Sequence, residues 1–96
     1  MYFVYMIRCQ DGSIYTGITT DLKRRFEEHR TGHGAKYTRS RRVIKIEAAW
    51  KCQGRSDASK LEAMIKKLPK DKKEQLIADE WTPAWLSVSD ISRCPL

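Results

Sequence analysis

Two side chains suited to phosphate or proton chemistry share the apolar face of a predicted helix. Four residues of a helix over 22–30 have the spacing i, i+3, i+4, i+7 and so lie on one face: Leu22, Arg25, Phe26 and His29. Because Leu22 and Phe26 must pack inward, Arg25 and His29 point the same way. Burying a guanidinium and an imidazole costs free energy unless polar or anionic groups meet them. The pair is a candidate for catalysis. In the structural alternative, the Arg25 guanidinium extends to solvent at the rim of the helix face and His29 hydrogen-bonds a backbone carbonyl.

A carboxylate lies at the edge of a second apolar helix face. A predicted helix over 56–68 carries an apolar stripe formed by Ala58, Leu61, Ile65 and Leu68. Glu62 flanks that stripe, about 90° from its centre at roughly 100° per residue. A carboxylate in this position either pairs with a base or holds a metal. An ion pair with Lys66 at i+4 is the structural alternative.

Two tyrosines of a predicted hairpin add phenol groups, and the turn decides whether they share a face. A two-residue turn puts Tyr5 and Tyr15 on opposite faces of the hairpin. A three-residue loop over 10–12, with Gly12 in the left-handed conformation, puts them on the same face. The sequence allows both turns, and a glycine at the third loop position suits the second. Gly17, in the middle of the second strand, indicates a bulge or a close approach to the backbone.

The elements that must position these residues follow the order β-β-α-β-α-α. Strands are predicted over 2–9, 13–18 and 43–52, and helices over 22–30, 56–68 and 70–78. A basic connection over 34–42 joins the first helix to the third strand. A hairpin comes first and no βαβ crossover follows. The simplest fold is therefore α/β of the α+β type, a three-stranded antiparallel sheet flanked by helices.

The chain is expected to divide into a domain and a tail. Ninety-six residues provide one hydrophobic core, which we assign to residues 1–80. Beyond residue 80 the periodicity is lost. Residues 81–96 are predicted to form a C-terminal tail in which 81–86 could dock on the core and 89–96 are disordered.

The charge distribution favours a polyanionic partner. The chain has 19 Lys+Arg against 12 Asp+Glu, a formal net charge of +7. Residues 23–45 hold nine basic side chains, and residues 60–73 add six lysines. Counterion release makes such a surface bind nucleic acid, the commonest polyanion in a cell. No long helix carries a basic face opposite a bulky apolar one, so we expect no membrane partner.

Other features exclude further classes. No apolar run approaches the roughly 18 residues that span a bilayer. The apolar residues 1–8 have no basic leader and no cleavage site, and are typical of a strand rather than a signal peptide. Cys9, Cys52 and Cys94 do not have metal-binding spacing. We expect a cytoplasmic protein with reduced thiols.

Five short motifs, in this order, resemble the GIY-YIG nuclease family. They are Val4-Tyr5-Met6, Tyr15-Thr16-Gly17, Arg24-Arg25 with His29 one turn beyond, Gly34-Ala35-Lys36-Tyr37-Thr38-Arg39, and Leu61-Glu62-Ala63-Met64-Ile65-Lys66-Lys67-Leu68. The last two are similar to the small single-domain bacterial branch, and the resemblance covers residues 2–78. Val4 stands where isoleucine is usual and Phe3 where glycine is usual. The chain contains no asparagine, so a family asparagine late in the domain has no match.

The resemblance implies a metal-dependent endonuclease that hydrolyses phosphodiester bonds. It places the functional positions at Tyr5, Tyr15, Arg25, His29 and Glu62. Glu62 would hold one divalent cation, Mg²⁺ with Mn²⁺ as a substitute, and Arg25 would supply charge to the transition state. Tyr5 would orient or deprotonate the water, with His29 as the candidate acceptor of its proton. Tyr15 would bond the phosphate or share the role of base.

Nucleic-acid contacts are expected mainly from the basic connection. The predicted contact residues are Gly17, Lys36, Tyr37, Thr38, Arg39, Arg41 and Arg42. Tyr37 could stack on an unpaired base. We expect single-stranded, flapped or branched DNA, read with little sequence specificity, in repair, recombination or DNA processing; RNA remains open. The alternatives are a non-catalytic binding module of the same fold and a nuclease subunit that needs a protein partner. We expect a monomer or a weak dimer.

Overall fold

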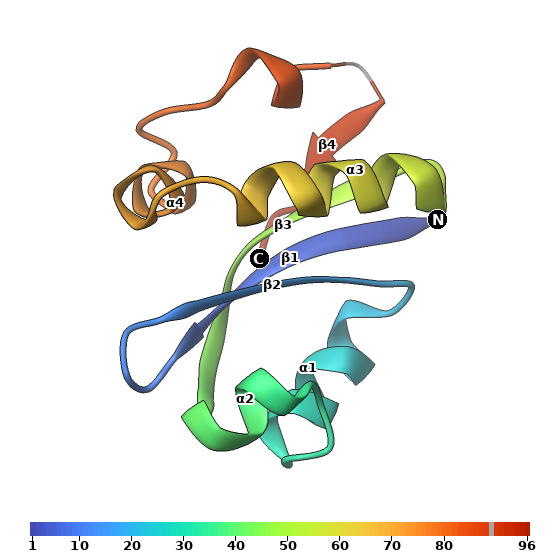
Figure 1. The fold of residues 1–96 in the computed structure, drawn as a ribbon. Helices are drawn as coiled ribbons and strands as arrows, with labels where there is room; N and C mark the ends of the chain where they lie inside the picture. The colour runs from blue at the N-terminus through green and yellow to red at the C-terminus, as the bar shows by residue number, and fades with distance from the viewer. Residues whose placement is uncertain (89) are drawn as a thin grey trace.

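A four-stranded antiparallel sheet with helices on both faces organises the molecule (Figure 1). The computed structural model describes residues 1–88 and 90–96. In chain order the elements are β1 (Tyr2–Cys9), β2 (Ile14–Thr19), α1 (Leu22–Arg30), α2 (Lys36–Arg41), β3 (Val43–Cys52), α3 (Arg55–Lys66), α4 (Lys70–Ile77), the 3₁₀ turn η1 (Ala84–Leu86) and β4 (Ile91–Arg93). The sheet order is β2-β1-β3-β4. Helices α1 and α2 cover one face, and α3 and α4 the other. None of these described helices has the length and apolar character needed to cross a membrane.

The β1–β2 hairpin closes through a three-residue loop. The Cys9 N–H donates to the Ser13 carbonyl at 2.9 Å, and Gly12 has a φ of 87°. Glycine occupies this left-handed position without the Cβ penalty of other residues. The register then places Tyr5 opposite Gly17 and aligns Tyr15 on the same face. The second of the two turns that the sequence allowed is therefore the one formed.

Alternation along β1 builds a core on each face of the sheet. Val4 and Met6 pack with residues of α3 and α4. Tyr5 and Ile7 point to the other face, where the apolar side of α1 packs. All four side chains are at most 2% exposed, as expected for a central strand covered on both sides. The two tyrosines and α1 thus share one face, whereas α3, which carries Glu62, lies on the opposite face.

The predicted three-stranded sheet and the predicted element order are both wrong. β4 pairs with β3, with Trp50 opposite Arg93 and Cys52 opposite Ile91, and adds a fourth strand. A three-residue strand is too short to show a periodic pattern, and only its pairing partner defines it. Residues 91–93, expected to be disordered, form this strand; Ser89 lies outside the described residues. The predicted connection over 34–42 contains α2, whose only buried residue is Thr38.

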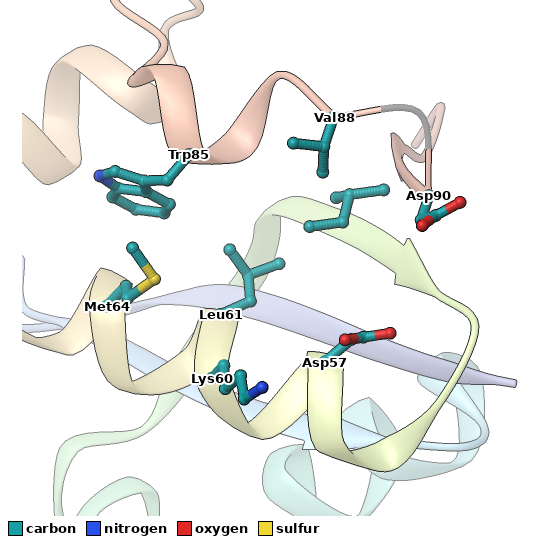
Figure 2. A pocket seen from close by; sticks show the side chains of 8 residues that line it. Asp57, Lys60, Leu61, Met64, Trp85, Val88 and Asp90 are labelled. Carbon is teal, nitrogen blue, oxygen red and sulfur yellow. The ribbon is translucent and has the colours of Figure 1, made fainter.

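The segment after α4 packs across α3. Leu86 is buried in the main core, and Trp85 packs against it. Figure 2 shows Trp85 and Val88 facing Met64 and Leu61 of α3 across a cavity of about 210 Å³. The tail is thereby held against the face of the sheet opposite to α1.

Arg93 connects β4 to the end of α4. Its guanidinium donates to the carbonyls of Leu76 at 3.0 Å and Ile77 at 2.7 Å. Both carbonyls belong to the last turn of α4, where backbone acceptors have no partner within the helix. The same guanidinium lies 5.5 Å from the centre of the Trp50 ring. One side chain therefore caps a helix and fixes the edge strand.

Candidate active site

A buried phenol contacts a buried imidazole beneath the sheet. Tyr5 is 2% exposed and His29 is 1% exposed. Tyr5 Oη lies 2.8 Å from His29 Nε2, a hydrogen-bond distance. β1 supplies the phenol, and the last turn of α1 supplies the imidazole. The structure therefore brings together the candidate base and the candidate acceptor of its proton.

Gly17 makes room for the Tyr5 ring on β2. A Cβ at this position would lie 2.6 Å from Tyr5 Oη and 3.0 Å from Tyr15 Cε2. The first distance is shorter than real Cβ atoms show and the second is a tight contact, so the phenol occupies the space that a larger residue would fill. Gly17 was predicted to contact nucleic acid. It is buried, and its role in the structure is instead to let Tyr5 lie across the strand.

The second imidazole nitrogen faces α2. Thr38 is 1% exposed, and its Oγ1 lies 2.7 Å from His29 Nδ1. The same hydroxyl donates to the Ala35 carbonyl at 2.9 Å. Thr38 was predicted to contact nucleic acid, and the structure buries it against His29 instead.

Gly34 lets the loop before α2 pack on the imidazole. A Cβ on Gly34 would overlap His29 Nδ1 and lie 2.8 Å from the His29 Cα. Only glycine permits this approach of the loop to the helix. Gly34 and Ala35 were not among the site residues predicted from the sequence. The sequence motif that contains both residues and Thr38 could be recognised, but the contact of this segment with His29 depends on how α2 packs over α1.

Burial controls the protonation of this pair. It raises the pKa of Tyr5 to about 12 and lowers the pKa of His29 to about 4. The positive charge of Arg25 favours the phenolate and so opposes the first shift; it repels an imidazolium and so adds to the second. At neutral pH the phenol keeps its proton and the imidazole is neutral. A neutral imidazole has one nitrogen that accepts a proton.

Arg25 and Tyr15 lie beside this pair. The Arg25 side chain is 30% exposed and its Nη1 lies 3.0 Å from Glu28 Oε1. The Tyr15 ring centre lies 6.2 Å from that of Tyr5 and 5.2 Å from that of His29. Arg25 is therefore partly open to solvent, where an incoming anion could exchange with Glu28.

Glu62 acts on Tyr5 from the α3 side of the sheet. Its side chain is 23% exposed and pairs with Lys66 Nζ at 3.3 Å, the ion pair that the sequence offered as an alternative. Its negative charge nevertheless contributes to the raised pKa of Tyr5. Among residues 1–88 and 90–96, no three or more His, Cys, Asp or Glu side chains form a metal cage. A single carboxylate fits Mg²⁺, which usually keeps several waters and takes further oxygens from phosphates.

An aromatic and cationic stack borders the site on α2. The Tyr37 ring lies 5.7 Å from the Tyr15 ring, and Arg41 Cζ lies 3.9 Å from the Tyr37 ring centre. Arg41 Nε also approaches Asp11 Oδ2 at 3.4 Å. Because Arg41 covers the Tyr37 ring, a base that stacked on this ring face would have to displace the guanidinium or lie on it. Lys36 of the same helix is exposed.

A basic cavity of about 380 Å³ opens on the α2 side of His29. Arg30, Arg39 and Arg42 line it, and the buried His29 and Thr38 also contribute to its wall. None of its described lining residues is acidic. Arg30 is paired with Glu27 at 2.7 Å, outside the cavity lining, so Arg39 and Arg42 are the arginines of this cavity that favour an anionic ligand.

Comparison with known proteins identifies the family. The GIY-YIG catalytic domain model matches residues 1–75. A UPF0213 protein of Fusobacterium nucleatum is 53% identical over 77 residues, 80% of this chain and 77% of its own. The solution structure of a UPF0213 protein from Bacillus halodurans has a TM-score of 0.54 at 40% identity, over 93% of this chain and 100% of that chain. A protein from E. faecalis has a TM-score of 0.56 at 45% identity, over 82% and 84%. The chain therefore belongs to the GIY-YIG nuclease family, in the branch of small bacterial UPF0213 proteins, as its sequence motifs predicted.

Proposed function

We propose that this protein is a metal-dependent endonuclease that hydrolyses phosphodiester bonds in DNA. The observation that carries the proposal is the 2.8 Å contact of Tyr5 Oη with His29 Nε2, which couples a buried phenol to a neutral proton acceptor. Arg25 lies beside this contact and is partly open to solvent. Hydrolysis of a phosphodiester needs an activated water and positive charge near phosphorus. The family assignment and the basic surface support the same reaction class.

The Tyr5–His29 contact offers a way to activate water without a free phenolate. With a pKa of about 12, Tyr5 does not ionise appreciably at neutral pH. In the proposed step the water oxygen bonds to phosphorus while its proton passes to Tyr5 Oη. The phenol proton passes at the same time to His29 Nε2, and the bond from phosphorus to the 3′-oxygen breaks, so that the 3′-oxygen leaves with the electron pair and takes a proton from solvent. The phenol is neutral before and after the step, and the proton ends on the imidazole.

Positive charge at phosphorus is assigned to Arg25. A substrate phosphate would replace Glu28 as the partner of its guanidinium, which can bind two phosphate oxygens at once. Tyr15 would donate a hydrogen bond to the same phosphate or share the role of base. Glu62 would hold one Mg²⁺, or Mn²⁺ in its place, which when bound supplies charge to the leaving oxygen and to a non-bridging oxygen.

The proposed substrate is single-stranded, flapped or branched DNA. Arg39, Arg41 and Arg42 would contact backbone phosphates, which position a strand without reading its bases. Little sequence specificity follows, and a role in repair, recombination or DNA processing suits such a nuclease. RNA carries the same phosphates and belongs among the substrates to be tested.

Cleavage of labelled oligonucleotides tests this function. Single-stranded, duplex and flapped DNA and single-stranded RNA are incubated with Mg²⁺, Mn²⁺ or EDTA. We expect metal-dependent cutting that falls about 100-fold or more in Tyr5→Phe, because the phenol can no longer relay a proton. Glu62→Ala should lose metal-dependent cutting and keep binding. Tyr2→Phe, a phenol removed outside the site, is the matched control.

Two outcomes would contradict the proposal. Binding of every substrate without cutting by any metal would favour the non-catalytic binding module or a nuclease subunit that needs a partner. Cutting that Tyr5→Phe and Glu62→Ala leave at the rate of Tyr2→Phe would place the chemistry elsewhere or attribute it to a contaminant.

A further inference from the structure

A buried chain of hydrogen bonds runs from the sheet through α1 to the start of α2. It links Tyr5 to His29 at 2.8 Å, His29 to Thr38 at 2.7 Å, and Thr38 to the Ala35 carbonyl at 2.9 Å. The three side chains are at most 2% exposed. Water therefore cannot easily replace any link, and the donors and acceptors along the chain have to match.

The chain of hydrogen bonds has a direction, which is set by its last acceptor, the Ala35 carbonyl. The carbonyl of Ala35 only accepts, so the single hydroxyl proton of Thr38 points to it. Thr38 Oγ1 then meets His29 Nδ1 with a lone pair, and Nδ1 has to carry the imidazole proton. A neutral imidazole has one N–H, so Nε2 has a lone pair and accepts the hydroxyl proton of Tyr5.

We infer that Thr38 is a positioning residue that sets the tautomer of His29 so that Nε2 can accept a proton from Tyr5. The inference rests on the proposed function for its catalytic consequence. With the other tautomer, Nε2–H would donate to the phenol oxygen, and no acceptor would remain for the phenol proton. The hydroxyl of Thr38 thus acts on the reaction through His29 and does not touch the substrate.

The backbone of α2 holds this hydroxyl in place. Thr38 is the one buried residue of that helix. The Ala35 carbonyl also accepts from the backbone N–H groups of Thr38 at 3.0 Å and Arg39 at 3.1 Å, which fixes it at the first turn. Gly34 lets the loop approach the imidazole. α2 is short and has little apolar surface, and its buried residue supplies the hydroxyl that contacts His29.

The surroundings of His29 explain why a neutral tautomer matters. Arg25 and Glu28 on its own helix are the charged groups that act on it. Tyr5 and Tyr15 face it from the sheet. Burial and the charge of Arg25 keep the imidazole neutral, so only one of its two nitrogens carries a proton. The choice between Nδ1–H and Nε2–H is left to hydrogen bonding, which Thr38 supplies.

Nitrogen-15 NMR of the full chain at neutral pH tests the tautomer directly and needs no nuclease activity. Long-range proton–nitrogen spectra distinguish a protonated from an unprotonated imidazole nitrogen, and His33→Gln assigns the His29 signals. We expect Nδ1–H in the wild type and in Thr38→Ser, which keeps the hydroxyl. In Thr38→Val, of nearly the same shape, Nε2–H should become the main form. Nε2–H in the wild type, or Nδ1–H unchanged in Thr38→Val, would overturn the inference.

Kinetics then separate positioning from substrate contact. We expect kcat of Thr38→Val to fall about 10- to 100-fold with KM within about 3-fold, and Thr38→Ser to recover most of kcat. A phosphate contact would instead raise KM and reduce the salt dependence of binding. If the wild type cuts and Thr38→Val cuts equally fast, the positioning role is wrong. If the wild type cuts nothing while the tautomer responds to Thr38 as expected, the proposed function fails and the tautomer assignment stands. Should Thr38→Val not fold, the wild-type and Thr38→Ser spectra and rates decide.

Discussion

The buried imidazole of His29 makes folding stability depend on pH. Its pKa is lowered from 6.5 to about 4 in the folded chain, chiefly by burial. Between these values the unfolded chain binds a proton that the folded chain does not. The free energy of unfolding therefore falls as pH drops through this window and is recovered above it. Between pH 7 and pH 5 we expect a loss of about 2 kcal/mol, measured by urea denaturation.

Substitution of each histidine isolates the source of this pH dependence. His29→Gln cannot titrate and should flatten the curve between pH 7 and pH 5. His33→Gln should leave the curve as it is, because His33 is exposed. An equal slope in the wild type and in His29→Gln would show that other groups cause the loss. The carboxylates of Asp11, Glu27 and Glu74 have lowered pKa values, so their contribution falls mostly below this window.

The close contact between Gly17 and Tyr5 predicts a sharp response to one methyl group. Gly17→Ala would place Cβ 2.6 Å from Tyr5 Oη, so the ring has to leave its position beside His29. We expect destabilisation of about 1–3 kcal/mol by overpacking and a fall in cleavage of about 10-fold or more, because the relay needs hydrogen-bond geometry. Gly54→Ser is the control, because a Cβ at Gly54 meets nothing within 4 Å. Wild-type cleavage by Gly17→Ala would mean that the ring position is not required.

Among the elements, those with a long apolar pattern were predictable and those defined by a partner were not. The bounds of β1, α1 and β3 match the sequence predictions. The two strands bury apolar residues in the sheet, and α1 packs the partly buried Leu22 and Phe26 at helical spacing on Tyr5 and Ile7. α2 buries only Thr38 and β4 has three residues, so neither shows a period. They depend on packing over α1 and on pairing with the free edge of β3.

The candidate site likewise contains residues that could be predicted from the sequence and residues that could not. The helical spacing of Arg25 and His29 was readable, and the glycine at the third loop position correctly favoured the register that places Tyr5 opposite Gly17. The contact of Thr38 with His29 joins two helices across a loop and leaves no periodic signal in the sequence. Basic residues around Thr38 suggested a nucleic-acid contact, whereas the hydroxyl itself is turned inward.

The contact of β4 with α4 predicts a loss of stability without a loss of chemistry. Arg93→Gln removes two hydrogen bonds to the last turn of α4 and a cation–π contact with Trp50. We expect a loss of about 1–2 kcal/mol in urea denaturation. Arg55→Gln, which removes the same charge from an exposed position, should stay within about 0.5 kcal/mol of wild type.

Cleavage well below the melting temperature should be unchanged in Arg93→Gln. β4 lies at the edge of the sheet opposite to β2, whose strand carries Gly17 and Tyr15. A fall in kcat as large as that of the site variants would show that the far edge is coupled to the site. An unchanged melting temperature would instead show that the hydrogen bonds of Arg93 do not hold the tail.

At the scale of the whole molecule, the proposed site groups come from both faces of the sheet. Arg25 and His29 belong to α1, and Glu62 belongs to α3, and these two helices lie on opposite faces of the sheet (Figure 1). β2 is the edge strand on this side of the sheet. A phosphate that meets both Arg25 and a metal held by Glu62 would therefore lie along the outer edge of β2. The proposed path of the nucleic acid runs along this edge and past the basic surface of α2.

Two equal changes in charge test that path. Arg39→Gln with Arg42→Gln removes two charges beside the cavity next to His29, and Lys67→Gln with Lys73→Gln removes one from the residue after α3 and one from α4. Either pair lowers the formal net charge from +7 to +5, since 7 − 2 = 5. We expect the arginine pair to reduce the slope of log K against log salt for single-stranded DNA by about 1.4, because each lost phosphate contact is worth about 0.7. The lysine pair should change the slope by less than half of this. Equal losses would instead assign binding to the overall positive field, because net charge alone does not distinguish the two surfaces.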